Sequence, residues 1–222
     1  MKNYTLQLEL LSPTLVGSGV GSGATIDSDI VVDDIGIPFI PAKRVKGCLL
    51  DAAREIEGIF SVAGIEKSDL QIEPAFGKPG NDTSAPIYFS NLYIKDYELN
   101  KTWLNYFLKS EAHKDLKDLV TYEQILKTFT EIRQQTKINN NGVAFDHSLR
   151  TIRVLQKGLT FYGDVQIKTD EEQIINTLLL ACLNFRRFGT KRNRGFGEVR
   201  CSLLSAGEIL SVSKKLEGLC TV

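Results

Sequence analysis

Hydrophobic positions along the chain follow two periods, one typical of strands and one typical of helices. Residues 4–11 alternate between apolar and polar side chains, which predicts a strand with one buried face. Apolar residues then recur at i, i+3, i+4 and i+7 between Val45 and Ile56, the spacing of a buried helix face. A similar apolar stripe runs from Ile174 to Leu183. The pattern therefore predicts two amphipathic helices set among strands.

The second helix has the clearest predicted start. Thr169 and Glu172 have the residue types and the spacing of a capping box, in which each side chain bonds the other residue's backbone N–H. Upstream of it, residues 149–167 alternate on both sides of Lys157-Gly158, which predicts a β-hairpin that turns there.

Strand patterns at 87–94 and 196–204 complete the order β-α-β-β-α-β. This order is typical of an α+β fold of the ferredoxin-like or RRM-like type, in which both helices cover one face of an antiparallel sheet. Polar helical patterns predict a peripheral insertion, outside the core, at about 96–127, and polar residues predict an exposed loop or β-ribbon at about 137–150. We expect one domain over 1–222.

Composition narrows the possible partners. The chain has 222 residues, of which 42% are hydrophobic, and its 27 basic and 27 acidic residues cancel. A balanced chain has no overall field that would attract polyanions, so any affinity for nucleic acid must come from local segregation of charge. No apolar run approaches the roughly 20 residues of a membrane span, and the first residues predict a strand, not a signal peptide. The four dispersed cysteines indicate free thiols in the cytoplasm.

Positive charge is segregated at "RRFGTKRNRGFGEVR", residues 186–200, which holds six cations and one anion. Arginine binds phosphate bidentately, and phenylalanine offers a face on which an unpaired base can stack. This mixture predicts contact with RNA or another single strand. The competing interpretation is that the phenylalanines belong to the core and the arginines are merely solvated. The candidate RNA-binding residues here are Arg187, Lys191, Arg192, Arg194, Gly195, Phe196 and Gly197.

A second group of cations, Lys43, Arg44 and Lys46, lies in the first turns of the first predicted helix. Cations oppose the helix dipole there, at a cost of roughly 0.3–1 kcal/mol each at low salt. Free N–H groups combined with cations form a phosphate site, which would explain why the cost is tolerated. A solvated positive patch is the alternative.

The glycine-rich segment at 17–23 precedes a group of aspartates. It partly matches a dinucleotide-binding fingerprint, but β-branched residues follow where that motif needs a helix, so we exclude this function. The glycines permit close approach of the backbone to a ligand, although a plain flexible loop is an equal alternative. Asp27 is the candidate for chemistry, whereas Asp33 and Asp34 have the character of turn residues. The candidate contacts in this segment are Gly17, Gly19, Gly21 and Gly23.

Four segments in order cover nearly the whole chain and together resemble the RAMP superfamily of CRISPR ribonucleoprotein subunits. They are "GSGVGSGATIDSDIVVDDIGIPFIPAKRVKG", "PAFGKPGNDTSAPIYFSNLYI", "LRTIRVLQKGLTFYGDVQI" and "RFGTKRNRGFGEV". The length and the "ATIDS" segment are most similar to the repeated backbone subunit of type III (Csm-type) effector complexes.

The resemblance implies a subunit that binds guide RNA (crRNA), stacks with copies of itself in a filament and joins other CRISPR effector subunits. By position, Asp27 matches an aspartate that cleaves complementary target RNA with Mg²⁺ or another divalent cation. Lys43, Arg44 and Lys46 match the guide-binding helix start, and residues around 139–150, which we call the thumb, include Arg150 as an RNA contact.

Two other functions stay open. The same architecture could bind guide RNA without cleaving target. A guide-processing endoribonuclease would more naturally use a histidine base, for which His113 and His147 are the only candidates.

Overall fold

The structure is a computed structural model that describes residues 2–19, 21, 25–65, 70–78, 85–109 and 120–211. Its main sheet is antiparallel, with β1 (Lys2–Leu10) in the centre. On one side β1 pairs with β7 (Thr160–Ile167), and on the other with β8 (Val199–Ser205). β3 (Ile87–Phe89) and β4 (Leu92–Ile94) both pair with β7, and β2 (Phe39–Ile40) lies at the edge beside β4. β9 (Glu208–Ile209) lies at the other edge, beside β8.

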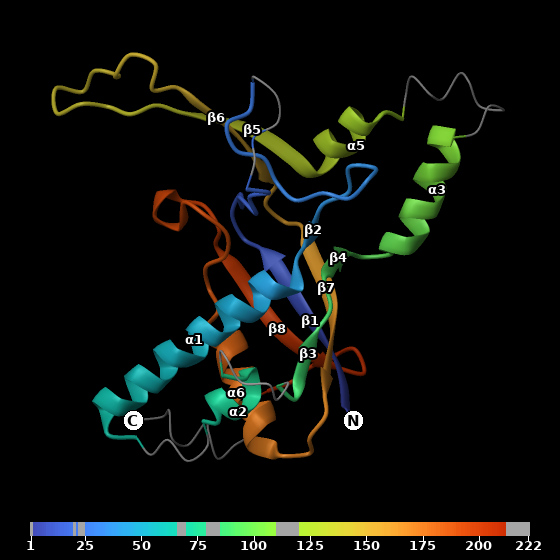
Figure 1. Ribbon diagram of the computed structural model, residues 1–222, viewed down its shortest axis with the longest axis vertical. Helices are drawn as coiled ribbons and strands as arrows, with labels where there is room; N and C mark the ends of the chain where they lie inside the picture. The colour runs from blue at the N-terminus through green and yellow to red at the C-terminus, as the bar shows by residue number, and fades with distance from the viewer. Residues whose placement is uncertain are drawn as a thin grey trace.

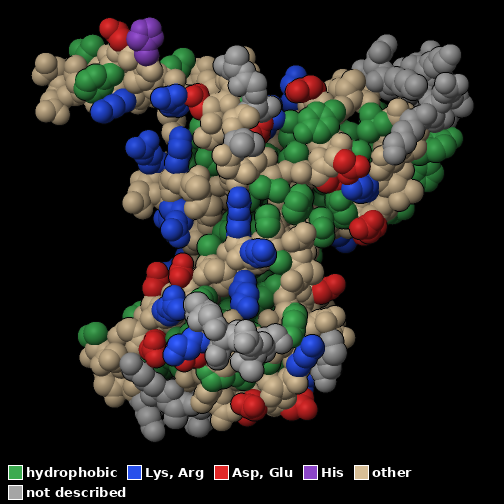
Figure 2. All heavy atoms as spheres, in the orientation of Figure 1, with side chains coloured by type: hydrophobic (Ala, Val, Ile, Leu, Met, Phe, Trp, Pro, Cys, Tyr) green, Lys and Arg blue, Asp and Glu red, His purple; other side chains and the backbone are tan. Residues whose placement is uncertain are grey.

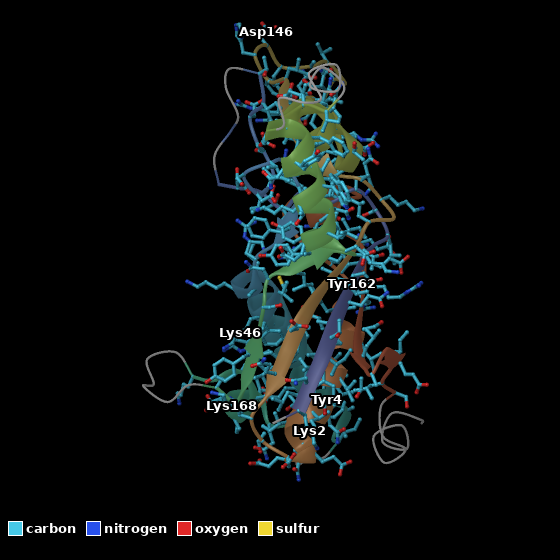
Figure 3. The ribbon with its side chains drawn as sticks, turned by 90° about the vertical axis from the view of Figure 1, so that its right-hand side faces the viewer. Lys2, Tyr4, Lys46, Asp146, Tyr162 and Lys168 are labelled. Carbon is cyan, nitrogen blue, oxygen red and sulfur yellow. The ribbon has the colours of Figure 1, made fainter. Side chains whose placement is uncertain are left out.

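Three helices cover one face of this sheet: α1 (Ala42–Ala63), α2 (Ile72–Phe76) and α6 (Glu172–Asn184) (Figure 1). Every second residue of β1 from Leu6 to Leu10 is buried beneath them, because successive side chains of a strand point to opposite faces. Viewed from the side in Figure 3, β1 and β7 lie in front and α1 lies behind them. The predicted order β-α-β-β-α-β and the α+β fold are confirmed.

A second, smaller part of the molecule lies beyond one end of the main sheet (Figure 1). It contains a two-stranded sheet of β5 (Thr130–Gln135) and β6 (Arg150–Leu155), from which the thumb extends. It also contains α3 (Tyr97–Lys109) and α5 (Tyr122–Phe129). Within the described residues, no helix is both long and apolar enough to cross a membrane.

The predicted hairpin over residues 149–167 is wrong. β6 pairs with β5 and β7 pairs with β1, so the two strands belong to different sheets. The turn between them is held by the end of β1 instead: the Gly158 N–H donates to the Leu10 carbonyl, and the Leu10 N–H donates to Leu159. The alternating pattern was correct for both strands but carried no information about their partners.

The predicted capping box at α6 is also wrong. The helix begins after Glu171, and no side chain caps it. The Thr169 hydroxyl accepts a hydrogen bond from the Glu171 N–H and does not cap the helix. Glu172 is the first helical residue, whereas the glutamate of a capping box is the third. A capping box does form at the start of α5, between Thr121 and Gln124.

Two burial predictions need correction. The insertion was expected to lie outside the core, but Ile125 and Leu126 of α5 are buried, and Leu126 joins the main hydrophobic cluster. Leu183 was assigned to the buried stripe of α6, but it is 62% exposed, and the buried positions of the helix end at Cys182. Cys182 and Cys201 are buried free thiols, Cys48 is a half-buried one, and Cys220 lies outside the described residues.

Candidate nucleic-acid interface

Three segments that are far apart in the sequence meet at a cavity of about 600 Å³. They are the glycine-rich segment with the aspartates behind it, the first turns of α1, and the loop before β8. Figure 2 shows Lys and Arg side chains gathered across the middle of this face of the molecule. The side chains and glycines that matter most here are Gly17, Gly19, Asp27, Lys43, Arg44 and Gly189.

Backbone pairing fixes how these segments meet. Leu15 pairs with Thr190 of the loop before β8, and Gly17 pairs with Ile30. Ser28 in turn pairs with Ile152 of β6. Single bridges thus join the two glycine-containing segments to each other and to the base of the thumb.

The first turn of α1 faces the cavity with two cations, Lys43 and Arg44. No acidic residue lies in this turn, and no side chain caps the helix at Pro41. Neither Lys43 nor Arg44 has a salt-bridge partner among the residues described. Lys46 is half-buried and does not line the cavity. Exposed cations without counter-ions at a helix N-terminus favour an anionic ligand.

Some glycines of the glycine-rich segment pack against neighbouring backbone, and others line the cavity. At Gly21 an added Cβ would lie 2.5 Å from the Ile26 carbonyl oxygen, so this glycine is required by packing. Gly19 has a positive φ of 92° and open space around it, and Gly17 also lines the cavity. Gly23 lies outside the described residues. Close approach to a ligand is therefore possible at Gly17 and Gly19.

Asp27 lies at the mouth of the cavity with its carboxylate already engaged. Oδ1 accepts a hydrogen bond from Arg150 Nη1 at 2.7 Å, and Oδ2 accepts one from the Thr151 N–H at 2.8 Å. These donors hold the pKa of the carboxyl below its ordinary value, the Arg150 hydrogen bond having the largest effect. Asp27 is therefore ionised at neutral pH, and its side chain keeps 34% exposure.

Asp29 and Asp33 have structural surroundings. Asp29 forms a salt bridge of 3.2 Å with Arg153, and both side chains are nearly buried. One carboxylate oxygen of Asp33 accepts from the N–H groups of Ile35 and Ile37, as the predicted turn requires. The other accepts from the Tyr97 hydroxyl, which ties this turn to α3.

The loop before β8 is held by glycines at both of its ends. An added Cβ at Gly189 would lie 2.5 Å from the Leu15 carbonyl oxygen, and one at Gly197 would collide with the Phe188 carbonyl. Both glycines have positive φ angles, of 82° and 77°. Between them a short 3-10 turn, Arg192–Arg194, presents exposed arginines that have no salt-bridge partner among the described residues.

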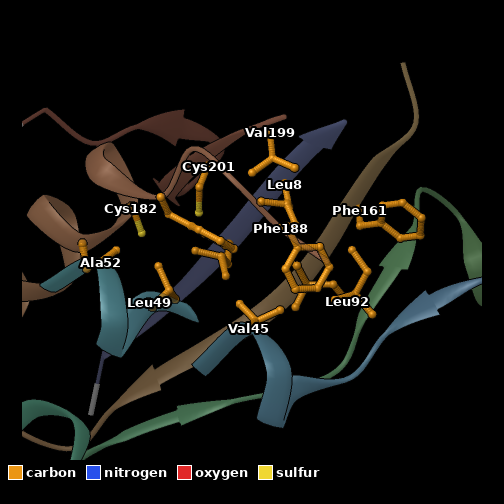
Figure 4. Packing of buried hydrophobic residues seen from close by; sticks show 14 of the residues in the cluster. Leu8, Val45, Leu49, Ala52, Leu92, Phe161, Cys182, Phe188, Val199 and Cys201 are labelled. Carbon is orange, nitrogen blue, oxygen red and sulfur yellow. The ribbon is translucent and has the colours of Figure 1, made fainter. Parts of the chain in front are cut away.

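The phenylalanines of this segment belong to the core. Phe188 is 1% exposed and lies between α1 and the sheet (Figure 4), and Phe185 is equally inaccessible. The expectation that they offer stacking faces is wrong, because both rings complete the packing beneath the loop. Phe196 is half-buried against the same cluster. The competing interpretation is right for the two buried rings. Of the arginines in this segment, Arg200 pairs with Glu9, whereas the other four form no salt bridge within the described part of the chain.

Lys191 connects the loop to the base of the thumb. Its ammonium group donates a hydrogen bond of 2.8 Å to Gln135 at the end of β5. Partial burial lowers the pKa of Lys191, and the charges of Arg194 and Arg150 lower it further, whereas Asp27 raises it. Arg150, Arg194 and Asp27 therefore all lie close enough to Lys191 for their charges to act on it.

A second cavity, of about 670 Å³, adjoins the first across α1, since Cys48 and Asp51 line both. Arg187 and Arg192 line it on one side, and Glu55 and Glu198 contribute opposite charge. The structure thus places most of the predicted cations at the first cavity, at the second or at the thumb base, and leaves Lys46 outside both cavities.

Asp27 is the candidate metal ligand among the residues that line the first cavity. Among the described residues, no three His, Cys, Asp or Glu side chains are grouped closely enough to hold an ion. Mg²⁺, however, is commonly bound by one or two carboxylates together with substrate phosphates. Asp27 fits this arrangement, because each carboxylate oxygen accepts only one hydrogen bond and keeps acceptor capacity.

Sequence reasoning missed several residues of this surface. Thr151 and Gln135 place Asp27 and Lys191 through a backbone N–H and an amide, and nothing in their own sequence context marks them. Gly189 could have been found, since glycine commonly supplies the positive φ that a tight turn needs. His147 is exposed in the thumb and does not line the cavity with Asp27, and His113 lies outside the described residues.

A model of one protein family matches the sequence over residues 7–200, and that family is the RAMP superfamily. The chain belongs to the RAMP superfamily. No curated protein matches the sequence.

Solved structures share the fold of this RAMP protein. One is a chain from the "Cryo-EM structure of the Type III-B Cmr-beta bound to cognate target RNA", with a TM-score of 0.64 and 15% identity over 91% of this chain and 97% of that one. Another comes from the "Type III-B Cmr-beta Cryo-EM structure of the Apo state", with a TM-score of 0.62 and 16% identity over 93% and 99% of the two chains. At this identity the likeness concerns the fold.

Proposed function

We propose that this chain is an RNA-binding subunit of a type III CRISPR effector complex. The observation that carries the proposal is that cations from α1 and from the loop before β8 line adjoining cavities and have no salt-bridge partner among the described residues. The RAMP superfamily match supports it, as does the fold shared with chains of type III-B complexes, one of which is bound to target RNA.

Each cationic group has a distinct part in this function. Lys43 and Arg44 bind backbone phosphates of the guide at the start of α1, where the helix dipole adds to their charge. Arg192, which lines the second cavity, and Arg194 of the same 3-10 turn bind further phosphates. Because phosphate contacts carry no sequence information, the subunit accepts guides of any sequence.

The finer proposal is that copies of this subunit form the backbone of the complex and that Asp27 takes part in cleaving complementary target RNA. Asp27 would hold a divalent cation jointly with RNA phosphates. When bound, such a cation stabilises the negative charge that develops on the scissile phosphate. The glycines at 17 and 19 leave room for the RNA backbone beside the carboxylate.

Substituting Asp27 by Asn tests the cleavage step. Asn keeps the size and the acceptor oxygen but removes the charge that a cation needs, so D27N should lose target cleavage in Mg²⁺ at least 100-fold, as for a group that stabilises charge in the transition state. Guide affinity should change less than about threefold. Cleavage is measured on labelled target with the guide-loaded assembly, and Asp33→Asn, at a turn outside the cavity, is the comparison variant.

A non-cleaving RNA-binding subunit is the second candidate. The observation that favours it is the salt bridge between Asp27 and Arg150, which occupies the carboxylate. A wild-type assembly that binds target but does not cut it with Mg²⁺, Mn²⁺ or Co²⁺ would establish this candidate.

A further inference from the structure

Arg150 is the first residue of β6, where the thumb joins the small sheet. Its side chain is 64% exposed, yet its guanidinium is bound to Asp27 Oδ1. Thr151, the next residue, makes two backbone hydrogen bonds with Asp27. The Asp27 N–H donates to the Thr151 carbonyl, and the Thr151 N–H donates to Asp27 Oδ2. The position of the carboxylate therefore depends on Thr151, and Arg150 only covers it.

A neighbouring pair shows what a structural salt bridge looks like in this molecule. Asp29 and Arg153 lie two and three residues further along the same two segments, and their side chains are only 13% and 12% exposed. Separating a nearly buried pair leaves uncompensated charges away from water, whereas an exposed pair separates at little cost. Arg150 can thus leave Asp27, and Arg153 cannot easily leave Asp29.

The surroundings of Arg150 favour a second anion. The charges of Arg150, Arg194 and Asp27 all act on Lys191. These three cations outnumber the one carboxylate, so net positive charge remains after Asp27 is paired with Arg150. A nucleic-acid phosphate offers a guanidinium two acceptor oxygens in the geometry that arginine prefers, and it gains the attraction of the other two cations as well.

We propose that Arg150 covers the Asp27 carboxylate in the RNA-free protein and releases it when a nucleic-acid phosphate binds the guanidinium. The proposal rests on the proposed function, since it concerns the same carboxylate. It adds a regulatory step: the carboxylate becomes available to a divalent cation only where RNA occupies the base of the thumb. The free protein is thereby kept from binding a cation, and from acting on RNA that is not correctly seated.

Paramagnetic broadening by Mn²⁺ tests the step without relying on cleavage. Amide signals of residues 26–29 are followed by NMR while Mn²⁺ is added, with and without a 2′-O-methyl RNA that cannot be cut by its own 2′-oxygen. In the wild type, broadening should appear at several-fold lower Mn²⁺ concentration when this RNA is bound. In R150Q the broadening should appear at that lower Mn²⁺ concentration even without RNA. In the double variant D27N/R150Q this broadening should be lost.

The matched control is Arg133→Gln. Arg133 lies on β5 of the same small sheet, is also exposed, and is paired with Glu131, so the substitution removes the same charge from the same region. R133Q should respond to Mn²⁺ as the wild type does.

Two results would overturn the proposal: equal Mn²⁺ response of R150Q and wild type in the absence of RNA, or an unchanged wild-type response when RNA is bound. RNA binding is measured in parallel by fluorescence anisotropy. Absence of RNA binding would defeat the proposed function and the release step together, while the RNA-free comparison would still decide whether Arg150 covers Asp27.

Discussion

Gly195 and Gly197 have nearly the same backbone conformation, with φ angles of 78° and 77°, but different surroundings. Nothing lies within 4 Å of a Cβ added at Gly195, whereas one at Gly197 would collide with the Phe188 carbonyl. The sequence placed both among the RNA-binding candidates. The structure shows that Gly197 is required for packing, since the loop before β8 cannot close on the core with a larger residue there.

Alanine at each position should separate these two effects. Gly195→Ala should lower the free energy of unfolding by about 1–2 kcal/mol, the cost of a left-handed conformation for a residue with a Cβ. Gly197→Ala adds a backbone collision, so the loss should reach about 4 kcal/mol or prevent folding. Urea unfolding measures both, and equal losses would contradict the packing argument.

Asp27 shows how far sequence reasoning reaches for a single site residue. Its position after the glycine-rich segment was enough to single it out. Its partners Arg150 and Thr151 lie more than a hundred residues away, and neither alternation nor composition indicates a contact over that separation. Contacts of this kind are decided by tertiary packing, which local patterns do not record.

At the scale of elements, periodicity predicted the secondary structure of each segment better than the elements with which it packs or pairs. The apolar stripe of α1 and the alternation of β1 and β7 were recognised because burial on one face imposes a period. The partner of β6 was not, since an alternating strand can pair with any suitable edge. The α6 start was misplaced because the residues of a capping box also occur as an ordinary turn, as they do at Thr169.

The loop before β8 is the element whose charge should matter most for RNA. Changing Arg192 and Arg194 together to Ala should weaken binding of unrelated RNA sequences alike, and should reduce the salt dependence of the logarithm of affinity by roughly one unit of slope per lost phosphate contact. Fluorescence anisotropy at several salt concentrations measures both quantities.

The control removes the same charge elsewhere. Lys2 and Lys78 are exposed and form salt bridges with Asp170 and Glu73, outside both cavities. Their double Ala variant should keep the wild-type slope. A folded Arg192/Arg194 variant that binds with unchanged affinity and slope would show that this loop is not an RNA contact.

For the whole molecule, the balance of charge bears on assembly. With 27 basic and 27 acidic residues, copies of the chain can lie side by side along an RNA without strong mutual repulsion. Together with the RAMP superfamily membership, this leads us to expect several copies on one long guide. Native mass spectrometry with guides of increasing length should show copy number rising with length, and a strict one-to-one complex on a long RNA would refute the expectation.

The single backbone bridges beneath the cavity have a consequence for biosynthesis. Leu15 pairs with Thr190, and Gly197 donates its N–H to Pro13, so the first cavity is closed by parts of the chain made early and late. Contacts of such long sequence separation form only after the later segment has left the ribosome. Until then α1 can present its cations, but the lining that Phe188, Gly189 and Thr190 give to the cavity is missing. A nascent chain should therefore be unable to hold a guide, and loading should await a completed fold.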